Sequence, residues 1–123
     1  MILELADGTQ LNIKNIFAGP KLIDGVMRDT FRIEVDPEVI NFDDLKKIFS
    51  DTSRTLTMST YNDDVKTCIG EGYSLFVSLS DTKRKVSPPP GKLVPDSYEE
   101  IYIVTMAQLT YQEYQNITSS SSK

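Results

Sequence analysis

The sequence of 123 residues contains no histidine and only one cysteine, Cys68. Without histidine the chain cannot form Ser-His-Asp or Cys-His nucleophilic sites, and it lacks the commonest general base and metal ligand. A single cysteine forms neither an intramolecular disulfide nor a zinc cluster. Because only nearby Lys66 is placed to activate the thiol, we expect Cys68 to be a small buried apolar residue of a strand.

Long apolar runs are absent as well. No segment approaches the roughly 20 apolar residues that cross a bilayer. Residues 1–8 lack the positive start and apolar segment of a secretory signal, since Glu4 interrupts them. Acidic residues outnumber basic ones by 18 to 13, and the net charge of -5 disfavours a bulk grip on nucleic acid. We therefore expect a cytoplasmic protein that binds neither membranes nor nucleic acid.

An apolar content of 39% suffices for one packed core. We expect a single α+β domain over residues 1–116, followed by a disordered serine-rich tail over 117–123 that has nothing to bury.

Alternating apolar residues and turn dipeptides predict that most of this domain is antiparallel sheet. Asp7-Gly8 and Asp24-Gly25 are each expected to join two strands, and Gly19-Pro20 is expected to end a strand. The last strand is apolar at consecutive positions, so we expect it to be covered on both faces and central in the sheet. In all, we predict about five to seven strands, among them residues 31–35, 54–61, 65–69, 73–80 and 100–110.

One main helix is expected at about 42–50. Asn41 is a suitable N-cap, acidic residues fill the first turn and lysines follow one turn later. Phe42, Leu45, Ile48 and Phe49 share one side, which predicts that the helix packs on one face of the sheet.

A mobile, basic, proline-rich loop is predicted over residues 82–97. It contains a run of three basic residues and a triple proline, and it lies in an otherwise acidic chain. Loops of this length in compact domains are often functional. If the protein recognises a partner, we expect the contact to involve Lys83, Arg84, Lys85, Pro88, Pro89, Pro90, Lys92 and Tyr98.

Other candidate sites have structural explanations. The carboxylate pairs Asp43-Asp44, Asp63-Asp64 and Glu99-Glu100 fit capping, turns and solubility, and none has the spacing of a known metal site. Gly70 and Gly72 fit a turn, because no helix opens after them to hold a phosphate. We therefore expect no catalytic residues, no cofactor and no metal.

Four segments resemble small uncharacterised proteins encoded among phage and prophage structural genes: residues 5–8 (LADG), 28–35 (RDTFRIEV), 42–49 (FDDLKKIF) and 104–111 (VTMAQLTY). The resemblance implies a virion-associated or tail-associated accessory protein, or an assembly factor. Such a protein acts through contacts with other proteins, including virion components or a second copy of itself.

Two alternatives stay open at this point. One is a regulatory or inhibitory protein-binding module that offers an acidic surface, which would require its acids to gather on one face. The other is an enzyme that uses carboxylates alone, which would require a cleft holding two acids from distant segments.

Overall fold

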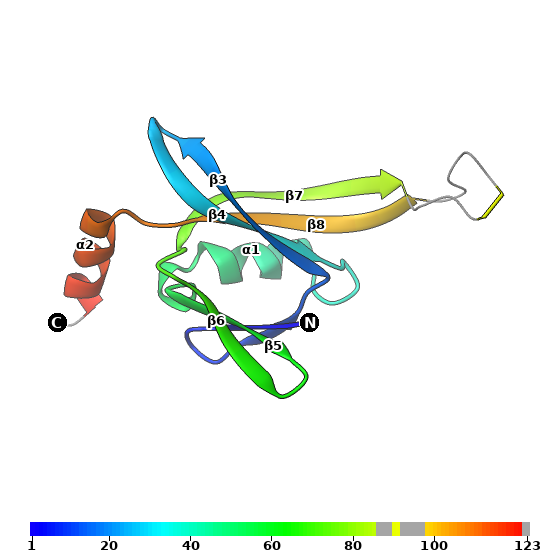
Figure 1. Cartoon of the computed structure of the whole chain (residues 1–123), viewed down its shortest axis with the longest axis horizontal. Helices are drawn as coiled ribbons and strands as arrows, with labels where there is room; N and C mark the ends of the chain where they lie inside the picture. The colour runs from blue at the N-terminus through cyan, green and yellow to red at the C-terminus, as the bar shows by residue number, and fades with distance from the viewer. Residues whose placement is uncertain (86–89, 92–97, 122–123) are drawn as a thin grey trace.

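The computed structural model describes residues 1–85, 90–91 and 98–121, which form two stacked antiparallel sheets and two helices (Figure 1). The first sheet has the strand order β2-β1-β5-β6 and the second β3-β4-β8-β7. The predicted α+β class is confirmed, but the expected single sheet of five to seven strands is eight strands divided between two sheets. The strands are β1 (Ile2–Leu5), β2 (Gln10–Asn12), β3 (Asn15–Ile23), β4 (Val26–Val35), β5 (Thr57–Asn62), β6 (Val65–Glu71), β7 (Leu75–Lys85) and β8 (Tyr98–Ala107); the helices are α1 (Phe42–Ser50) and α2 (Tyr111–Ser121), with a short 3₁₀ turn at Thr52–Arg54.

Both Asp-Gly dipeptides form the predicted turns. Gly8, between β1 and β2, has a φ of +87°. Asp24 and Gly25, with φ values of +49° and +79°, join β3 to β4 in a two-residue hairpin whose twist suits the flanking strands. The prediction that Gly19-Pro20 ends a strand was wrong, since β3 runs through both residues. β3 is an edge strand, where a proline is tolerated because only one side of the backbone pairs.

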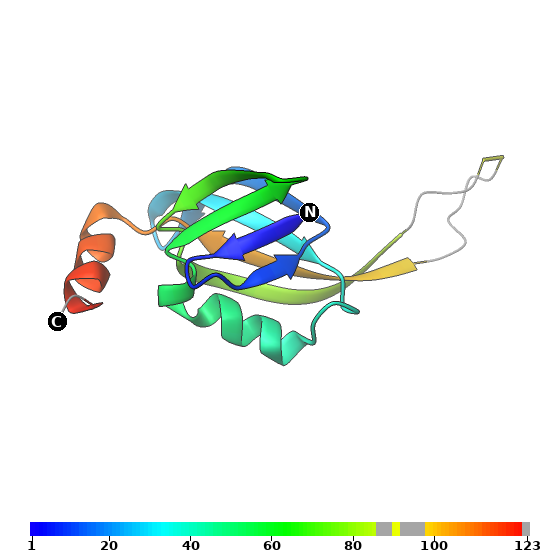
Figure 2. The same cartoon turned by 90° about the horizontal axis from the view of Figure 1, so that it is seen from below.

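The core lies between the sheets, and α1 closes one side of it (Figure 2). The Asn41 side chain accepts a hydrogen bond from the Asp44 amide at 2.8 Å, so the predicted N-cap is confirmed. Leu45 and Phe49 are fully buried, and the helix packs on β7 and β8 as its apolar stripe predicted. β8 is an interior strand, also as predicted. The buried apolar cluster consists of Leu3, Leu5, Leu11, Ile13, Phe31, Ile33, Val35, Leu45, Phe49, Met58, Tyr102, Val104 and Met106.

The loop predicted over residues 82–97 is shorter than expected. β7 continues to Lys85 and β8 begins at Tyr98, because the two strands pair in register all the way to Lys85 opposite Tyr98. Favourable cross-strand partners support this extension, since two basic positions of β7 stand opposite glutamates of β8 in the register. Pro90 and Gly91 form an exposed turn. Residues 86–89 and 92–97 lie outside the described part of the chain.

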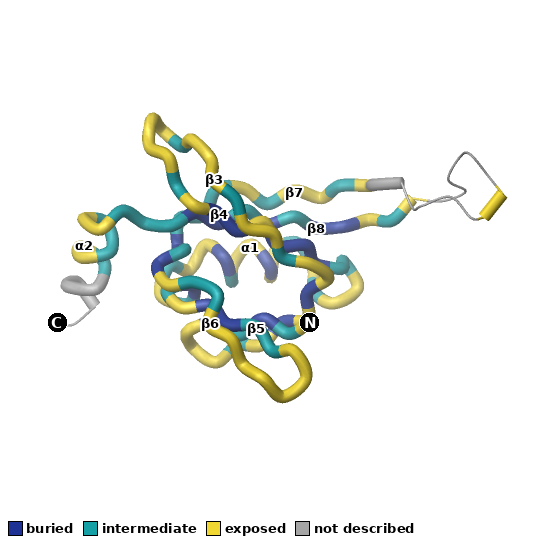
Figure 3. Tube along the Cα trace, in the orientation of Figure 1, coloured by how far each residue is buried: buried dark blue, intermediate teal, exposed yellow. Residues whose placement is uncertain are grey.

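Two further expectations differ from the structure. Cys68 is exposed and not buried, because β6 is an edge strand with a largely exposed surface. The chain after β8 forms α2 as far as Ser121, beyond residue 117 where the sequence placed the start of the tail. Figure 3 shows exposed residues at the ends of the β3–β4 and β5–β6 hairpins, whereas the described side chains of α2 are partly exposed and partly intermediate.

Candidate protein-contact surface

Those predicted contact residues that the structure describes lie on the β7–β8 hairpin, which extends past the sandwich on the side opposite α2 (Figures 1 and 2). Lys83 is exposed in β7, and Tyr98 begins β8 with 62% of its surface exposed. The backbones of Arg84 and Lys85 continue β7. Pro90 belongs to the exposed turn, and Pro88, Pro89 and Lys92 lie outside the described residues.

The described part of this hairpin contains acidic as well as basic positions. Lys83 pairs in register with Glu100 and Arg84 with Glu99, while Lys14 reaches Glu99 at 2.7 Å. Asp81 on β7 lies close enough to Glu100 to raise the pKa of that carboxyl through a shared hydrogen bond and charge repulsion. The described part of the hairpin therefore carries charges of both signs.

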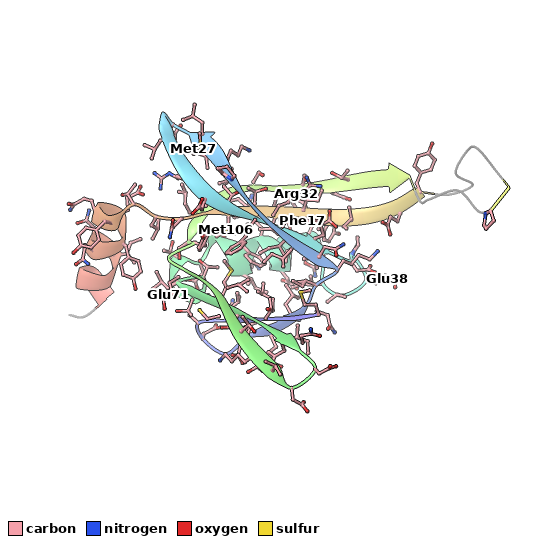
Figure 4. All side chains as sticks on the ribbon, in the orientation of Figure 1. Phe17, Met27, Arg32, Glu38, Glu71 and Met106 are labelled. Carbon is pink, nitrogen blue, oxygen red and sulfur yellow. The ribbon has the colours of Figure 1, made fainter. Side chains whose placement is uncertain are left out.

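A second surface lies at the other end of the molecule, where the β3–β4 hairpin and α2 approach the end of β6. A groove of about 610 Å³ separates them. Figure 4 shows Met27 on the projecting hairpin and Glu71 at the end of β6. The residues that line the groove are Val26, Met27, Arg28, Asp29, Glu71, Gly72, Gln108, Leu109, Thr110, Tyr111 and Tyr114.

Arg28 connects β4 to α2 across the floor of this groove. Its Nη1 donates to the Glu113 carboxylate at 2.7 Å and to the Gln108 carbonyl at 2.9 Å, and its Nη2 donates to Glu113 at 3.4 Å. The Arg28 side chain is only 9% exposed, so the pair is partly shielded from water. The Arg28 Nε is buried without a hydrogen-bond partner within the described residues. The guanidinium beside Glu113 is the main reason that the pKa of this carboxyl falls to about 2.

A capping box starts α2 at the edge of the groove. The Thr110 hydroxyl accepts a hydrogen bond from the Glu113 amide at 3.2 Å, and the Glu113 carboxylate accepts one from the Thr110 amide at 2.8 Å. This reciprocal pair satisfies two backbone donors that would otherwise lack partners at the helix start. Glu113 therefore both caps the helix and ties it to β4.

Gly72 lies where α2 contacts the rest of the fold. Its φ of +76° is a backbone conformation that side chains disfavour, and an added Cβ would lie 3.3 Å from the ring of Tyr114. The Gly72 carbonyl also accepts the Leu109 amide at 2.7 Å. The prediction of a turn glycine was right for Gly72, whose missing side chain leaves room for an aromatic ring. It was wrong for Gly70, which lies inside β6, where an added Cβ would meet the ring of Tyr73.

Exposed apolar side chains gather at the end of the β3–β4 hairpin. Leu22 is 63% exposed, Met27 64% and Val26 41%, and Tyr111 across the groove is 81% exposed. We call Leu22, Val26 and Met27 the hairpin-tip patch. Exposed apolar residues that are scattered singly over a surface are common, whereas contiguous apolar patches are typical of surfaces that contact a partner.

The sequence contains local signals for parts of this surface. Residues 110–113 read Thr-Tyr-Gln-Glu, the spacing of a capping box, and so announce a helix start. Leu22-Ile23 and Val26-Met27 flank the Asp24-Gly25 turn, which places apolar residues at a hairpin end. The salt bridge from Arg28 to Glu113 joins positions 85 residues apart and has no local signature.

Two further findings bear on chemistry at the surface. Among the described residues, no group of three or more acidic, cysteine or histidine side chains is placed to hold a metal ion. Neither helix of the described chain has the length and apolarity that crossing a membrane requires.

Comparison with known proteins gives no relative for the chain: no protein-family model, no curated protein and no solved structure matches it.

Proposed function

We propose that this protein is a non-enzymatic structural or accessory protein of phage or prophage type, associated with the virion or its assembly, which acts through contacts with other proteins. The observation that supports this most is the hairpin-tip patch. Leu22 and Met27 are each more than 60% exposed at the end of a projecting two-stranded arm. Exposing such side chains to water is unfavourable unless a partner covers them, because burial of each is worth about 1.5–3 kcal/mol.

The arrangement of the sheets adds a second means of contact. β3 and β7 are the edge strands of the longer sheet, and each spans nine residues or more. An edge strand presents backbone N–H and C=O groups that pair with a strand of another chain. The two ends of the molecule would thus serve as separate docking points in an assembly.

A regulatory module with an acidic face is supported less well. Several acidic side chains pair with cations in different parts of the fold: Asp7 with Arg54, Glu4 with Lys66, Glu99 with Lys14 and Glu113 with Arg28. Local pairing of this kind reduces the negative potential that a mimic of nucleic-acid phosphates requires.

Carboxylate chemistry is also supported less well. Asp81 and Glu100 come from different strands and interact, but both are exposed on the extended β7–β8 hairpin. A catalytic pair of acids works in a cleft that excludes water and holds the substrate.

The experiment that tests the proposal is co-expression of the tagged chain with the product of each gene that flanks its own. We expect at least one virion or tail component to co-purify stoichiometrically and to increase the sedimentation coefficient. A chain that stays monomeric and retains none of these products would count against the proposal, and so would exclusive association with a metabolic enzyme.

A further inference from the structure

The groove between the β3–β4 hairpin and α2 combines an apolar wall with acidic margins. Val26, Met27, Leu109 and the tyrosines of α2 supply the apolar surface. Its volume of about 610 Å³ lies in the range that holds a ligand or a few side chains of a peptide.

The charges of the groove are unbalanced. Arg28 is the cation among the described residues that line it, and its charge is taken up by the bidentate contact with Glu113. Asp29 and Glu71 also line the groove, and both are exposed. A ligand in the groove therefore meets two carboxylates whose negative charge the lining does not neutralise.

We infer that this groove docks a basic, apolar segment of a partner protein, with apolar side chains against Met27 and Tyr111 and lysine or arginine beside Asp29 and Glu71. The inference rests on the proposed function and adds the site and the chemistry of the partner. Charge complementarity of this kind speeds association and excludes acidic partners. Tyrosine is also one of the residues enriched where proteins meet.

Other classes of occupant fit less well. A small molecule confined to the groove would leave Leu22 uncovered, because the apolar patch continues beyond the groove to the end of the hairpin. An anionic membrane surface or a nucleic acid would be repelled by Asp24 at the turn and by Asp29 and Glu71 in the groove. A protein segment covers both the groove and the hairpin end.

The test is fluorescence anisotropy with a labelled twelve-residue peptide of alternating leucine and lysine, compared with a leucine and glutamate peptide of the same length. We expect saturable binding of the basic peptide that weakens with salt, and no binding of the acidic one. The D29N/E71Q double variant should bind the basic peptide about tenfold more weakly, since two exposed ion pairs are lost.

The matched control is D63N/D64N, which removes the same charge at the exposed turn between β5 and β6. Asparagine tolerates the positive φ that Asp63 adopts in the wild-type chain, so the turn keeps its shape. Binding by the control within about twofold of the wild type supports a local site, because screening limits the reach of distant charges. A third variant, Met27→Ser, should weaken binding of the basic peptide without altering the charge of the groove.

Three results of the peptide assay would overturn the inference. Equal weakening of peptide binding by both charge-removing variants would indicate bulk electrostatic attraction, and equal binding of both peptides would indicate nonspecific apolar adhesion. The third is that the basic peptide does not bind at all. Concentration-dependent self-association that D29N/E71Q abolishes would also overturn it, because a second copy would then occupy the groove. The proposed function is judged separately. If a flanking gene product co-purifies with D29N/E71Q as well as with the wild type, the proposed function stands, and the groove is not the surface that binds this partner.

Discussion

Replacement of Glu113 by alanine should release α2 while the sandwich stays folded. The substitution removes hydrogen bonds to Arg28 at 2.7 and 3.4 Å and the capping bond from the Thr110 amide at 2.8 Å. Breaking a fully buried ion pair costs about 3–5 kcal/mol. Glu113 is 41% exposed, so solvent screens the pair, and we expect α2 docking to lose about 2 kcal/mol, of which about 1 kcal/mol is the cap.

Amide hydrogen exchange measures this loss locally. The Tyr114 amide donates to the Thr110 carbonyl at 2.9 Å and reports on the first turn of α2. A loss of about 2 kcal/mol corresponds to roughly thirtyfold faster exchange. Amides of β8 should change little, because no core contact is removed. Gln112→Ala on the exposed side of the same helix is the control, and we expect it to leave exchange within about twofold of the wild type.

The same contact predicts a pH dependence. Arg28 and the Thr110 amide lower the pKa of Glu113 from 4.5 to about 2, so the stabilisation is complete above pH 4.5 and is lost as the pH falls towards 2. Gly72 lies against the Tyr114 ring. The NMR chemical shift of its backbone amide should therefore follow this transition in the wild type and not in Glu113→Ala. Equal loss of protection in α2 and β8, or unchanged exchange in α2, would refute the assignment of Glu113 as the tether.

Three further predictions about the fold can be tested by chemical denaturation. Gly70→Ala should destabilise the protein by about 1–3 kcal/mol, because the new Cβ would lie 2.5 Å from the Tyr73 ring and 2.7 Å from the Phe31 ring, while Gly19→Ala, with nothing within 4 Å, should change stability by less than about 1 kcal/mol. Asn41→Ala should cost about 1 kcal/mol through loss of the α1 cap, and Asn41→Asp should retain most of that stability. Phe49→Ala should cost about 3–5 kcal/mol, since the ring is fully buried against the core cluster; a cost below about 1 kcal/mol would contradict the packing of α1.

Local features of the fold were predictable because short-range chemistry determines them. The Asn41 cap and the apolar stripe of residues 42–49 specify α1, and each Asp-Gly pair specifies a hairpin turn. The consecutive apolar residues of β8 predicted its interior position.

The division into two sheets was not predictable from alternation alone, because a period of two shows which face is apolar and not which strand is the neighbour. The chain crosses between the sheets just after β2. There the Ile13 amide donates a hydrogen bond to the Met1 carbonyl, and the next amide, of Lys14, donates to the Glu34 carbonyl in β4. The alternation of apolar and polar residues in β4 also did not predict that Glu34 is buried. Its carboxylate accepts hydrogen bonds from Asn15 at 3.1 Å and Arg32 at 3.4 Å, so polar side chains cover a position that alternation would place in solvent.

The candidate surface was only partly predictable for the same reason. The run of basic residues at 83–85 drew attention to one end of the molecule, and strand pairing then placed glutamates opposite two of them. The groove at the other end is assembled from residues near 28, 72 and 110, which are far apart in the sequence and meet only in the folded chain. A capping box signalled the helix, but nothing local signalled its tether to Arg28.

The most direct test of the central claim, that the projecting β3–β4 hairpin is a protein-contact surface, is co-purification of flanking gene products with the L22S/M27S variant. Val65→Ser serves as the control, since Val65 is 66% exposed and lies at the turn between β5 and β6. We expect L22S/M27S to remain folded and to lose the partner, while Val65→Ser retains it. Undiminished recovery of the partner by L22S/M27S would contradict the claim.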